Sequence, residues 1–255
     1  MIESHNPKTP IQRHRGYRTA DYFAAAGLLF VVLLVVAVVW PALQVGPTSR
    51  GPSPCKLNLR QIGSALHNYH DQYKTFPPAF VNGPEGKPWH SWRVLLLPYL
   101  NEEKLYSEYR FDEPWNGPHN LLLLKRRPDV FCCFGAKPHI SPGHTSYSAI
   151  VGDEAAWPGP TGVSVKDISD GTSTTIIVVE MRDAGIPWLA PDDLSFDEVC
   201  VAPSEKPGRQ PSSWHTGGLQ ILLGDGSVRF VNSTIDLVTW RALLTRNGGE
   251  AVNDY

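Results

Sequence analysis

A long apolar segment near the N-terminus is the feature that most constrains this chain. No Asp, Glu, Lys, Arg or His occurs between Asp21 and Arg50, and Tyr22 to Leu43 form an apolar run of 22 residues. At about 1.5 Å per helical residue, such a run can cross a hydrocarbon core of roughly 30 Å. We therefore predict a transmembrane helix over residues 22–43 and a lipid bilayer as a partner.

Basic residues flank this run unevenly, which predicts its orientation. Lys8, Arg13, Arg15 and Arg18 precede it, and Arg50, Lys56 and Arg60 follow more sparsely. The bias favours a polar cytoplasmic tail over residues 1–21 and an exported C-terminal part. The alternative is a cleaved secretory signal, which needs an apolar region of only about 7–15 residues and a small-x-small site. The run is longer, and Ala42-Leu43-Gln44 is a poor site.

The charge of the exported part excludes a polyanionic partner. Of the 23 basic and 25 acidic residues, four basic and two acidic ones lie in the first 21 positions. The remainder carries 19 basic and 23 acidic residues, a net charge of −4. Because phosphate contacts dominate nucleic-acid affinity, we expect no nucleic-acid binding. No cofactor motif is present, since both the Walker and the dinucleotide-binding fingerprints are missing, and we expect no cofactor.

The exported region is predicted to be an α+β domain over residues 55–255, joined to the membrane helix by a Pro/Gly neck over residues 44–54. Its first element is an amphipathic helix that ends at Phe76-Pro77-Pro78. The apolar residues of this helix recur at spacings of three and four; they are Cys55, Leu59, Ile62, Leu66, Tyr69 and Tyr73. We expect that stripe to pack on an antiparallel sheet.

Further elements follow from local patterns. A second helix is predicted over Ser91–Tyr109, kinked or divided at Pro98. β-Branched and aromatic residues predict strands over Thr145–Val151 and Ser173–Glu180. Residues 187–211 are expected to form a long loop, and residues 234–244 a short helix.

A β-hairpin near the C-terminus is the clearest local signal. Asp225-Gly226 is a two-residue turn of the kind that favours type I′ geometry. That turn places Leu223 opposite Val228 and Ile221 opposite Phe230. One face then carries the residues expected to be buried, Leu219, Ile221, Leu223, Val228 and Phe230. The other face carries Gln220, Leu222, Ser227 and Arg229.

Four cysteines in an exported domain allow disulfides. Cys132 and Cys133 are adjacent and can hardly bridge each other without strain. We expect one of them to pair with Cys55 or Cys200, and the residues leave all four of these pairings open. Because no C-x-x-C spacing supports a zinc site, no metal site is predicted.

Several segments together resemble one bacterial family. His215, nine residues and Asp225-Gly226 form an H-x9-DG signature within the hairpin region of residues 215–231, and the helix opening at Cys55 matches in the same order. The segments His90–Tyr99 and Asp170–Ile177 also match. The chain resembles the prepilin-like family called domain of unknown function 1559. The resemblance spans about three quarters of the chain.

The resemblance implies a fold and a place in the cell. The family is similar to type IV pilins and type II secretion pseudopilins, which have an apolar N-terminal helix and a pilin-like exported head. It implies a single-pass protein of the bacterial inner (cytoplasmic) membrane whose head is periplasmic or extracellular. Gly16-Tyr17, with Asp21 at the fifth mature position, is a degenerate candidate for a prepilin leader site. The neck interrupts the continuous helix that pilins have.

Candidate chemistry is weak, and we predict no catalytic residue. About ten residues of strand separate His215 from Asp225, or roughly 30 Å, so an acid–base pair is not expected. A structural hydrogen bond from His215 to a loop carbonyl is expected instead. Asp170 is a weak calcium candidate, more simply explained as a turn residue. The acidic residues of the 187–211 loop, Asp192, Asp193, Asp197 and Glu198, are expected to be solvated.

Function is inferred from the anchor and the resemblance. We expect a membrane-anchored, pseudopilin-like assembly or interaction module without enzymatic activity, whose partners are pseudopilin or secretion-system components. The alternative is a surface protein that binds a glycan or another exported ligand, and a hydrolytic enzyme is third. The aromatic residues that favour the glycan alternative are Trp89, Trp92, Tyr99, Tyr106, Tyr109 and Trp115. Their near-helical spacing is more typical of a core.

Overall fold

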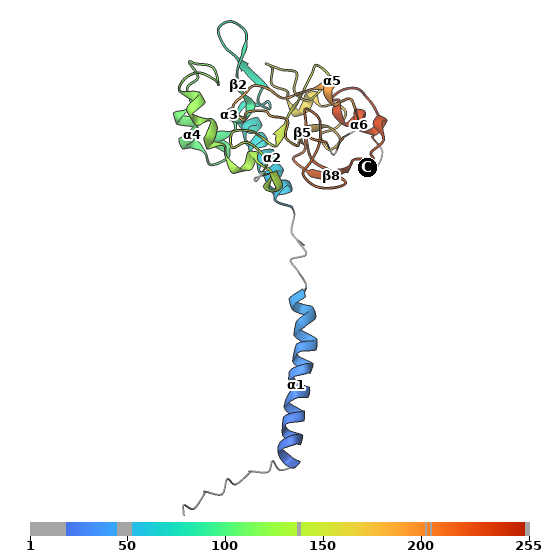
Figure 1. Cartoon of the computed structure of the whole chain (residues 1–255). Helices are drawn as coiled ribbons and strands as arrows, with labels where there is room; N and C mark the ends of the chain where they lie inside the picture. Colours follow the sequence, from blue (N-terminus) through green and yellow to red (C-terminus); the bar gives the residue numbers. More distant parts are fainter. Residues whose placement is uncertain (1–18, 45–52, 137–138, 202, 205, 253–255) are drawn as a thin grey trace, which may run out of the picture. The chain divides into compact units, whose positions relative to one another are not determined.

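The computed structural model (Figure 1) describes residues 19–44, 53–136, 139–201, 203–204 and 206–252. The chain divides into two compact units, residues 1–51 and 52–255, which are described separately below. The candidate leader residues Gly16 and Tyr17, the Asp21 side chain and most of the predicted neck lie outside the described residues.

Helix α1 of the first unit covers Thr19–Gln44 and includes the whole apolar run. The side chains described in it are Phe23 and residues 26–37, which are all exposed. Among the described residues, no helix is both long enough and apolar enough for a membrane crossing. The predicted transmembrane helix is therefore not supported by the structure.

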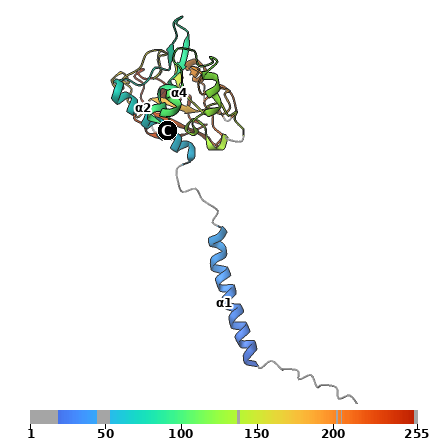
Figure 2. The same cartoon turned by 90° about the vertical axis from the view of Figure 1, so that its left-hand side faces the viewer.

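The second unit, called the head below, is built on a four-stranded antiparallel sheet with the order β3-β5-β7-β8. Its strands are β3 Tyr147–Ser148, β5 Ile176–Glu180, β7 Gly218–Leu223 and β8 Val228–Asn232. Two small pairs complete the strands: antiparallel β1 Phe80–Asn82 with β2 Pro88–Ser91, and parallel β4 Ile150–Val151 with β6 Leu194–Ser195. The loop of the β1–β2 hairpin projects from the head in both views (Figure 1, Figure 2). The head is thus α+β, as predicted.

Helix α2, Pro54–Tyr73, covers one face of the sheet. Its start is fixed locally, because Pro54 is preorganised for the first turn and the Ser53 side chain accepts a hydrogen bond from the Lys56 N–H. It ends at Lys74, whose φ of 65° is left-handed. Four residues of the predicted stripe, Cys55, Leu59, Ile62 and Leu66, are fully buried, which confirms the amphipathic helix.

Two hydrophobic clusters, one on each face, show that the sheet lies between two layers of packed elements. On one face, Leu59 and Ile62 of α2 share a cluster with Leu222 and Val228. On the other face, Ile221 and Leu223 share a second cluster with Trp240 of α6. The second layer contains α5 Phe196–Val199 and α6 Leu237–Leu244. At about 1.5–3 kcal/mol per fully buried aliphatic side chain, these two clusters dominate the stability of the head.

Several predicted elements are shorter or divided in the structure. The region predicted as a second helix contains α3 Trp92–Leu95, η1 Leu97–Tyr99 and α4 Glu103–Glu108, since Pro98 interrupts the helical hydrogen bonding. The predicted strand 145–151 contains β3 and β4, and the strand 173–180 begins only at Ile176. The remaining short 3-10 helices of the described residues are η2 Asn120–Arg126, η3 Asp129–Phe131, η4 Phe134–Ala136 and η5 Val165–Asp167.

The β7–β8 hairpin is confirmed, but its predicted register is wrong by one residue. Leu222, not Leu223, lies opposite Val228. Only Gly226 in the turn has a positive φ, 82°, and its N–H donates to the Leu223 carbonyl. This is a three-residue loop with a glycine bulge instead of a type I′ turn. Leu219, Ile221, Leu223 and Val228 are buried as predicted, but the slip moves the β8 residues to the other face relative to β7. Val228 therefore shares a face with Leu222, which is fully buried, and Phe230 is 45% exposed.

Candidate functional site

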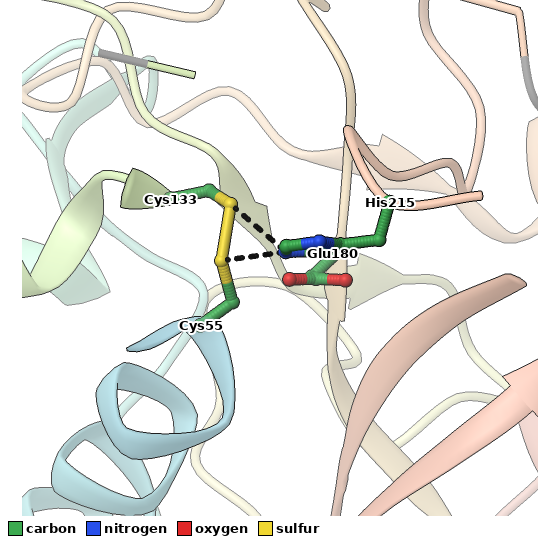
Figure 3. Close-up of side chains that lie close together, drawn as sticks. All are labelled: Cys55, Cys133, Glu180 and His215. Carbon is green, nitrogen blue, oxygen red and sulfur yellow. Dashed lines mark hydrogen bonds between the residues drawn. A yellow bond between two sulfur atoms is a disulfide. The ribbon is translucent and has the colours of Figure 1, made fainter. Parts of the chain in front are cut away.

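Four chemically reactive side chains from four separate segments meet in the head (Figure 3). Cys55 lies in the first turn of α2, Cys133 follows η3, Glu180 ends β5, and His215 precedes β7. One ligand atom from each residue lies within 4.8 Å of the others. This group is called the Cys–His–Glu cluster below.

His215 faces two sulfur atoms in this cluster. Its Nε2 lies 3.3 Å from the Cys55 Sγ and 3.6 Å from the Cys133 Sγ. The two cysteines form a disulfide, which Figure 3 shows beside the imidazole ring. The ring therefore packs against this disulfide, where a hydrogen bond to a loop carbonyl was expected. The structure adopts one of the cysteine pairings that the sequence left open.

Glu180 is the buried acid of the cluster, with only 2% of its surface exposed. Its Oε2 accepts hydrogen bonds from the Ser213 Oγ at 2.9 Å and from the Gln220 N–H at 2.8 Å. Its Oε1 has no hydrogen-bond partner among the described residues. Burial raises the pKa of this carboxyl to about 7, although the two hydrogen bonds oppose the shift.

Ser213 links the acid to the histidine. Its Oγ accepts a hydrogen bond from the backbone N–H of His215 at 3.1 Å and donates one to Glu180. Ser213 is itself buried. One hydroxyl group thus holds both the Glu180 carboxylate and the His215 main chain, while the His215 Nε2 faces the two sulfurs.

The other two cysteines lie outside the disulfide. Cys132 is buried, and its Sγ donates a weak hydrogen bond to the Cys133 carbonyl at 3.4 Å. Cys200 is partly exposed at the end of α5, and burial raises the pKa of its thiol. Neither sulfur belongs to the group of four ligand atoms.

The far end of the H-x9-DG motif is a turn that packs on α2. The Asp225 Oδ1 accepts a hydrogen bond from the Ser227 N–H at 2.8 Å, as turn residues do. A Cβ on Gly226 would lie 3.3 Å from the His67 ring, and one on Gly63 would lie 3.5 Å from the Gly226 Cα. His215 contacts Cys55 at the start of the same helix. Both ends of the motif therefore dock α2 onto the sheet.

Asp170, the calcium candidate, binds the C-terminal segment instead of facing open space. Its Oδ2 accepts hydrogen bonds from the Gly248 N–H at 2.7 Å and from the Thr245 hydroxyl at 3.1 Å. Its Oδ1 accepts one from the Gly249 N–H at 2.8 Å. With both oxygens in use, this carboxylate fixes the chain after α6.

The acidic loop divides into a buried part and an exposed part. Asp193 was expected to be solvated, which is wrong, because it is buried against Arg93 at 2.5 Å. Burial raises the pKa of the Asp193 carboxyl, and the Arg93 guanidinium opposes that shift. Asp192 and Glu198, by contrast, pair with Arg209 near the surface.

The aromatic residues considered for ligand stacking mainly serve the core. Trp92 is fully buried and donates its indole N–H to Asp193, and buried Tyr109 hydrogen-bonds His90 at 2.8 Å. The others, Trp89, Tyr99, Tyr106 and Trp115, are partly buried. These six aromatic residues therefore fit the prediction that they pack in the core better than the alternative of a ligand-stacking surface.

A surface groove of about 350 Å³ lies beside the exposed face of α2. Its lining residues come from α2, η1 and the segments next to them: Leu57, Arg60, Gln61, Ser64, Tyr99, Leu100, Asn101 and Val130. Burial and nearby tyrosines raise the pKa of Tyr99 to about 12. This α2–η1 groove has no carboxylate and no imidazole in its lining.

Sequence reasoning missed Glu180 as a site residue. The strand pattern ending in Ile-Ile-Val-Val-Glu carried the signal, because a carboxylate at the end of a fully apolar strand is rarely buried without a partner. Nothing in the spacing of residues 55, 133, 180 and 215 predicts that they meet. Only the antiparallel neighbourhood of β5 and β7 and the docking of α2 bring them together.

Comparison with known proteins gives one family. A family model described as "Protein of unknown function (DUF1559)" matches residues 53–140 and 202–238. The matched ranges include Cys55, Cys133, His215 and the Asp225-Gly226 turn, but not Glu180. No curated protein and no solved structure matches the chain.

Proposed function

Because the chain belongs to the DUF1559 family of proteins of unknown function, we propose its role from its own residues. It is a single-pass membrane protein with an exported α+β head. The head acts as a non-enzymatic assembly or interaction module, similar to a pseudopilin. Its partners are further copies of the chain, pseudopilins or secretion-system components.

The anchoring part of this proposal is supported by the sequence. The run from Tyr22 to Leu43 has no charged residue, and basic residues are denser before it. A helix that is apolar on all sides needs either a protein core or lipid around it. Apolar residues described in α1, such as Leu28 and Phe30, are more than 60% exposed in the isolated chain. Lipid accounts for this exposure, with the head periplasmic or extracellular.

The exposed face of α2 is the observation that best supports an interaction of the head with a neighbouring subunit. One face of this helix is buried on β7 and β8, and the opposite face lines the α2–η1 groove. Leu57 lies in this groove and is 45% exposed. A groove lined by both apolar and polar side chains, such as Leu100 and Gln61, suits a segment of a neighbouring protein subunit. We assign it to such a subunit in a membrane-bound assembly.

Two observations favour a non-enzymatic role over the alternatives. The groove has neither a carboxylate nor an imidazole, and His215 packs against a disulfide instead of a nucleophile. A hydrolytic site needs a base within reach of a nucleophile or a water. A glycan-binding surface needs exposed aromatic platforms, yet Trp92 and Tyr109 are buried. A melting temperature of the full-length chain that rises with a polysaccharide would support the glycan alternative.

Photocross-linking in intact membranes tests the proposal. A photoreactive residue is placed at Leu57 in the groove, and as a matched control at Lys87, whose side chain is 75% exposed on the β1–β2 hairpin. We expect cross-linked ladders of this chain, or adducts with secretion components, from position 57 and few from position 87. Alkaline extraction of the same membranes should leave the full-length chain in the pellet.

Two results would contradict the proposal. Recovery of the full-length chain in the soluble fraction would contradict the proposed membrane anchor. If the chain is present in the membrane at its native abundance and neither position gives a cross-link, the proposed assembly role is contradicted.

A further inference from the structure

The Cys–His–Glu cluster is not used by the proposed function, and its atoms have the arrangement of a metal site. We propose that the dithiol form of this chain binds one Zn²⁺ ion through Cys55, Cys133, Glu180 and His215. The inference goes beyond the assembly role, and it holds whether or not the head assembles.

The spacing of the imidazole and the two sulfurs fits a tetrahedral zinc site. With Zn–S bonds of about 2.3 Å and Zn–N bonds of about 2.0–2.1 Å, neighbouring S and N ligands lie about 3.6 Å apart. The His215 Nε2 lies 3.3 and 3.6 Å from the two sulfurs. The two sulfurs must separate to about 3.8 Å once their bond is broken, and the carboxylate oxygen, which lies within 4.8 Å of the other ligand atoms, must come to about 3.5 Å from them. The Cα atoms of the two cysteines, 5.1 Å apart, permit this by side-chain rotation.

The carboxylate supplies an independent sign of a missing ligand. The Glu180 Oε1 is buried and has no hydrogen-bond partner in the described part of the chain, while Oε2 is held by Ser213 and Gln220. A buried carboxylate oxygen without a partner is costly and calls for an unseen ion or donor. Figure 3 shows the Glu180 carboxylate next to the His215 ring and the sulfurs.

The hydrogen bonds behind the cluster match those of metal sites. Ligating carboxylates and histidines are oriented by further partners that are not ligands themselves. Ser213 does this for Glu180, since it donates to the Glu180 Oε2, and it also holds the main chain of His215 by accepting from its N–H. Two thiolates, an imidazole and a carboxylate favour Zn²⁺ over Ca²⁺ or Mg²⁺. Four protein ligands leave no open position, which makes this a structural site.

Metal binding and the disulfide exclude each other, because both use the same two sulfurs. The newly made chain carries the two thiols and needs no reductant. In the oxidised chain, a dithiol reductant supplies two electrons and two protons, becomes a disulfide itself and leaves two thiols. Zn²⁺ then binds the two thiolates, and the two thiol protons pass to water. The cluster is thus either cross-linked or metallated.

Metal analysis of the full-length chain in detergent tests this inference. The chain is reduced, freed of metal with a chelator, incubated with Zn²⁺ and desalted. We expect one zinc per reduced chain and none in the oxidised chain. With Co²⁺ as the probe, the reduced chain should give the intense visible absorption of tetrahedral cobalt and a thiolate charge-transfer band.

Substitutions test whether zinc is bound by the four proposed ligands or by the other two cysteines. Glu180→Gln keeps the shape and removes the anionic ligand. We expect it to weaken zinc binding about 100-fold, and Ser213→Ala about tenfold, because outer partners alone contribute about 10–100-fold. The double variant Cys132→Ser/Cys200→Ser removes only thiols outside the cluster and should bind zinc as the wild type does.

Each result decides the inference. Absence of zinc from the reduced wild type overturns it, and so does wild-type affinity in Glu180→Gln and His215→Ala. Loss of zinc in Cys132→Ser/Cys200→Ser, with near-ultraviolet circular dichroism unchanged, shows a different thiol site and also overturns it. The oxidised wild type serves as the non-binding control. Because it carries no substitution, its failure to bind zinc does not result from misfolding of a variant.

Discussion

Two buried carboxylates in the head have opposite surroundings. Asp193 accepts hydrogen bonds on both oxygens, from Arg93, Trp92, Ser148 and the Ala149 N–H. Glu180 has two donors on its Oε2 and, in the part of the chain that the structure describes, no hydrogen-bond partner on its Oε1. The first site is complete with protein groups alone. The second is incomplete without a proton or a metal ion.

The difference indicates what each site does. A carboxylate with all its donors and a buried counter-ion fixes the packing of the elements around it and leaves nothing for a ligand. Here Asp193 joins α3 to β3 and to the segment before β6. A buried carboxylate with a vacant oxygen beside two sulfurs and an imidazole stabilises little by itself. We therefore expect substitutions at the two sites to respond in opposite ways.

The largest effect is expected from Arg93→Met. Arg93 and Asp193 are almost fully buried, and removal of one partner leaves an uncompensated buried charge. Breaking such a pair costs about 3–5 kcal/mol. Urea unfolding of the full-length chain in detergent should show a free energy of unfolding lower by that amount.

The double variant Arg93→Met/Asp193→Leu is the control for that change. It removes both charges, so its loss of stability should be smaller than that of Arg93→Met alone. A double variant less stable than the single one contradicts the assignment of the loss to an unpaired charge.

The second effect concerns the disulfide of the Cys–His–Glu cluster. Cys55 and Cys133 are 78 positions apart, and the cross-link lowers the entropy of the unfolded chain. In metal-free buffer, Cys55→Ser/Cys133→Ser should lower the free energy of unfolding by about 2–4 kcal/mol.

Comparison with the reduced wild type makes this second test sharper. Without metal, the reduced wild type should be about as unstable as the double serine variant. With excess Zn²⁺, the wild type should regain stability and the serine variant should not, because only a folded site binds the ion. Equal responses of the two chains to zinc argue against a site built on these sulfurs.

The third effect is the pH dependence of Glu180→Gln in the oxidised chain. The pKa of Glu180 is raised from 4.5 to about 7 by burial. Between these values the unfolded chain releases the proton and the folded chain keeps it. The carboxyl therefore destabilises the fold increasingly from about pH 4.5 to about pH 7. Relative to the wild type, Glu180→Gln should be more favourable by about 1–3 kcal/mol at pH 8 than at pH 5.

The control for the pH test is the matched amide at the other site. Asp193→Asn leaves Arg93 buried and unpaired, so it should lose stability at both pH values. Melting curves at pH 5 and pH 8 measure both variants. A Glu180→Gln variant with the same relative stability at both pH values shows that Glu180 does not keep its proton in the fold.

Local patterns predicted the elements of the head better than their contacts. The apolar spacing of α2 and the Asp225-Gly226 turn gave a helix and a hairpin that the structure contains. The register failed because the choice between a two-residue and a three-residue loop depends on the φ of Asp225 and Gly226, and the composition allows either.

The two buried polar sites could not be predicted, because each joins distant segments. Arg93 stands in the apolar sequence Trp-Arg-Val-Leu-Leu-Leu, a sign of a buried cation, but its partner lies 100 positions away. The Cys–His–Glu cluster draws on residues 55, 133, 180 and 215, which share no metal-binding spacing. Sequence patterns report on neighbours within a helix or hairpin, whereas these sites depend on how the layers stack.

The smallest effect is expected at the exposed neighbour of the Asp193 site. Asp192 precedes Asp193 in the chain, yet its partner Arg209 is 38% exposed at the side chain and also pairs with Glu198. Solvent screens such pairs, and their usual contribution is about 0–1 kcal/mol. Arg209→Met should therefore change the free energy of unfolding by less than about 1 kcal/mol, and added salt should remove the difference. A loss near that of Arg93→Met would instead mean that the Arg209 hydrogen bond to the Asp193 carbonyl, at 2.7 Å, holds the buried site together.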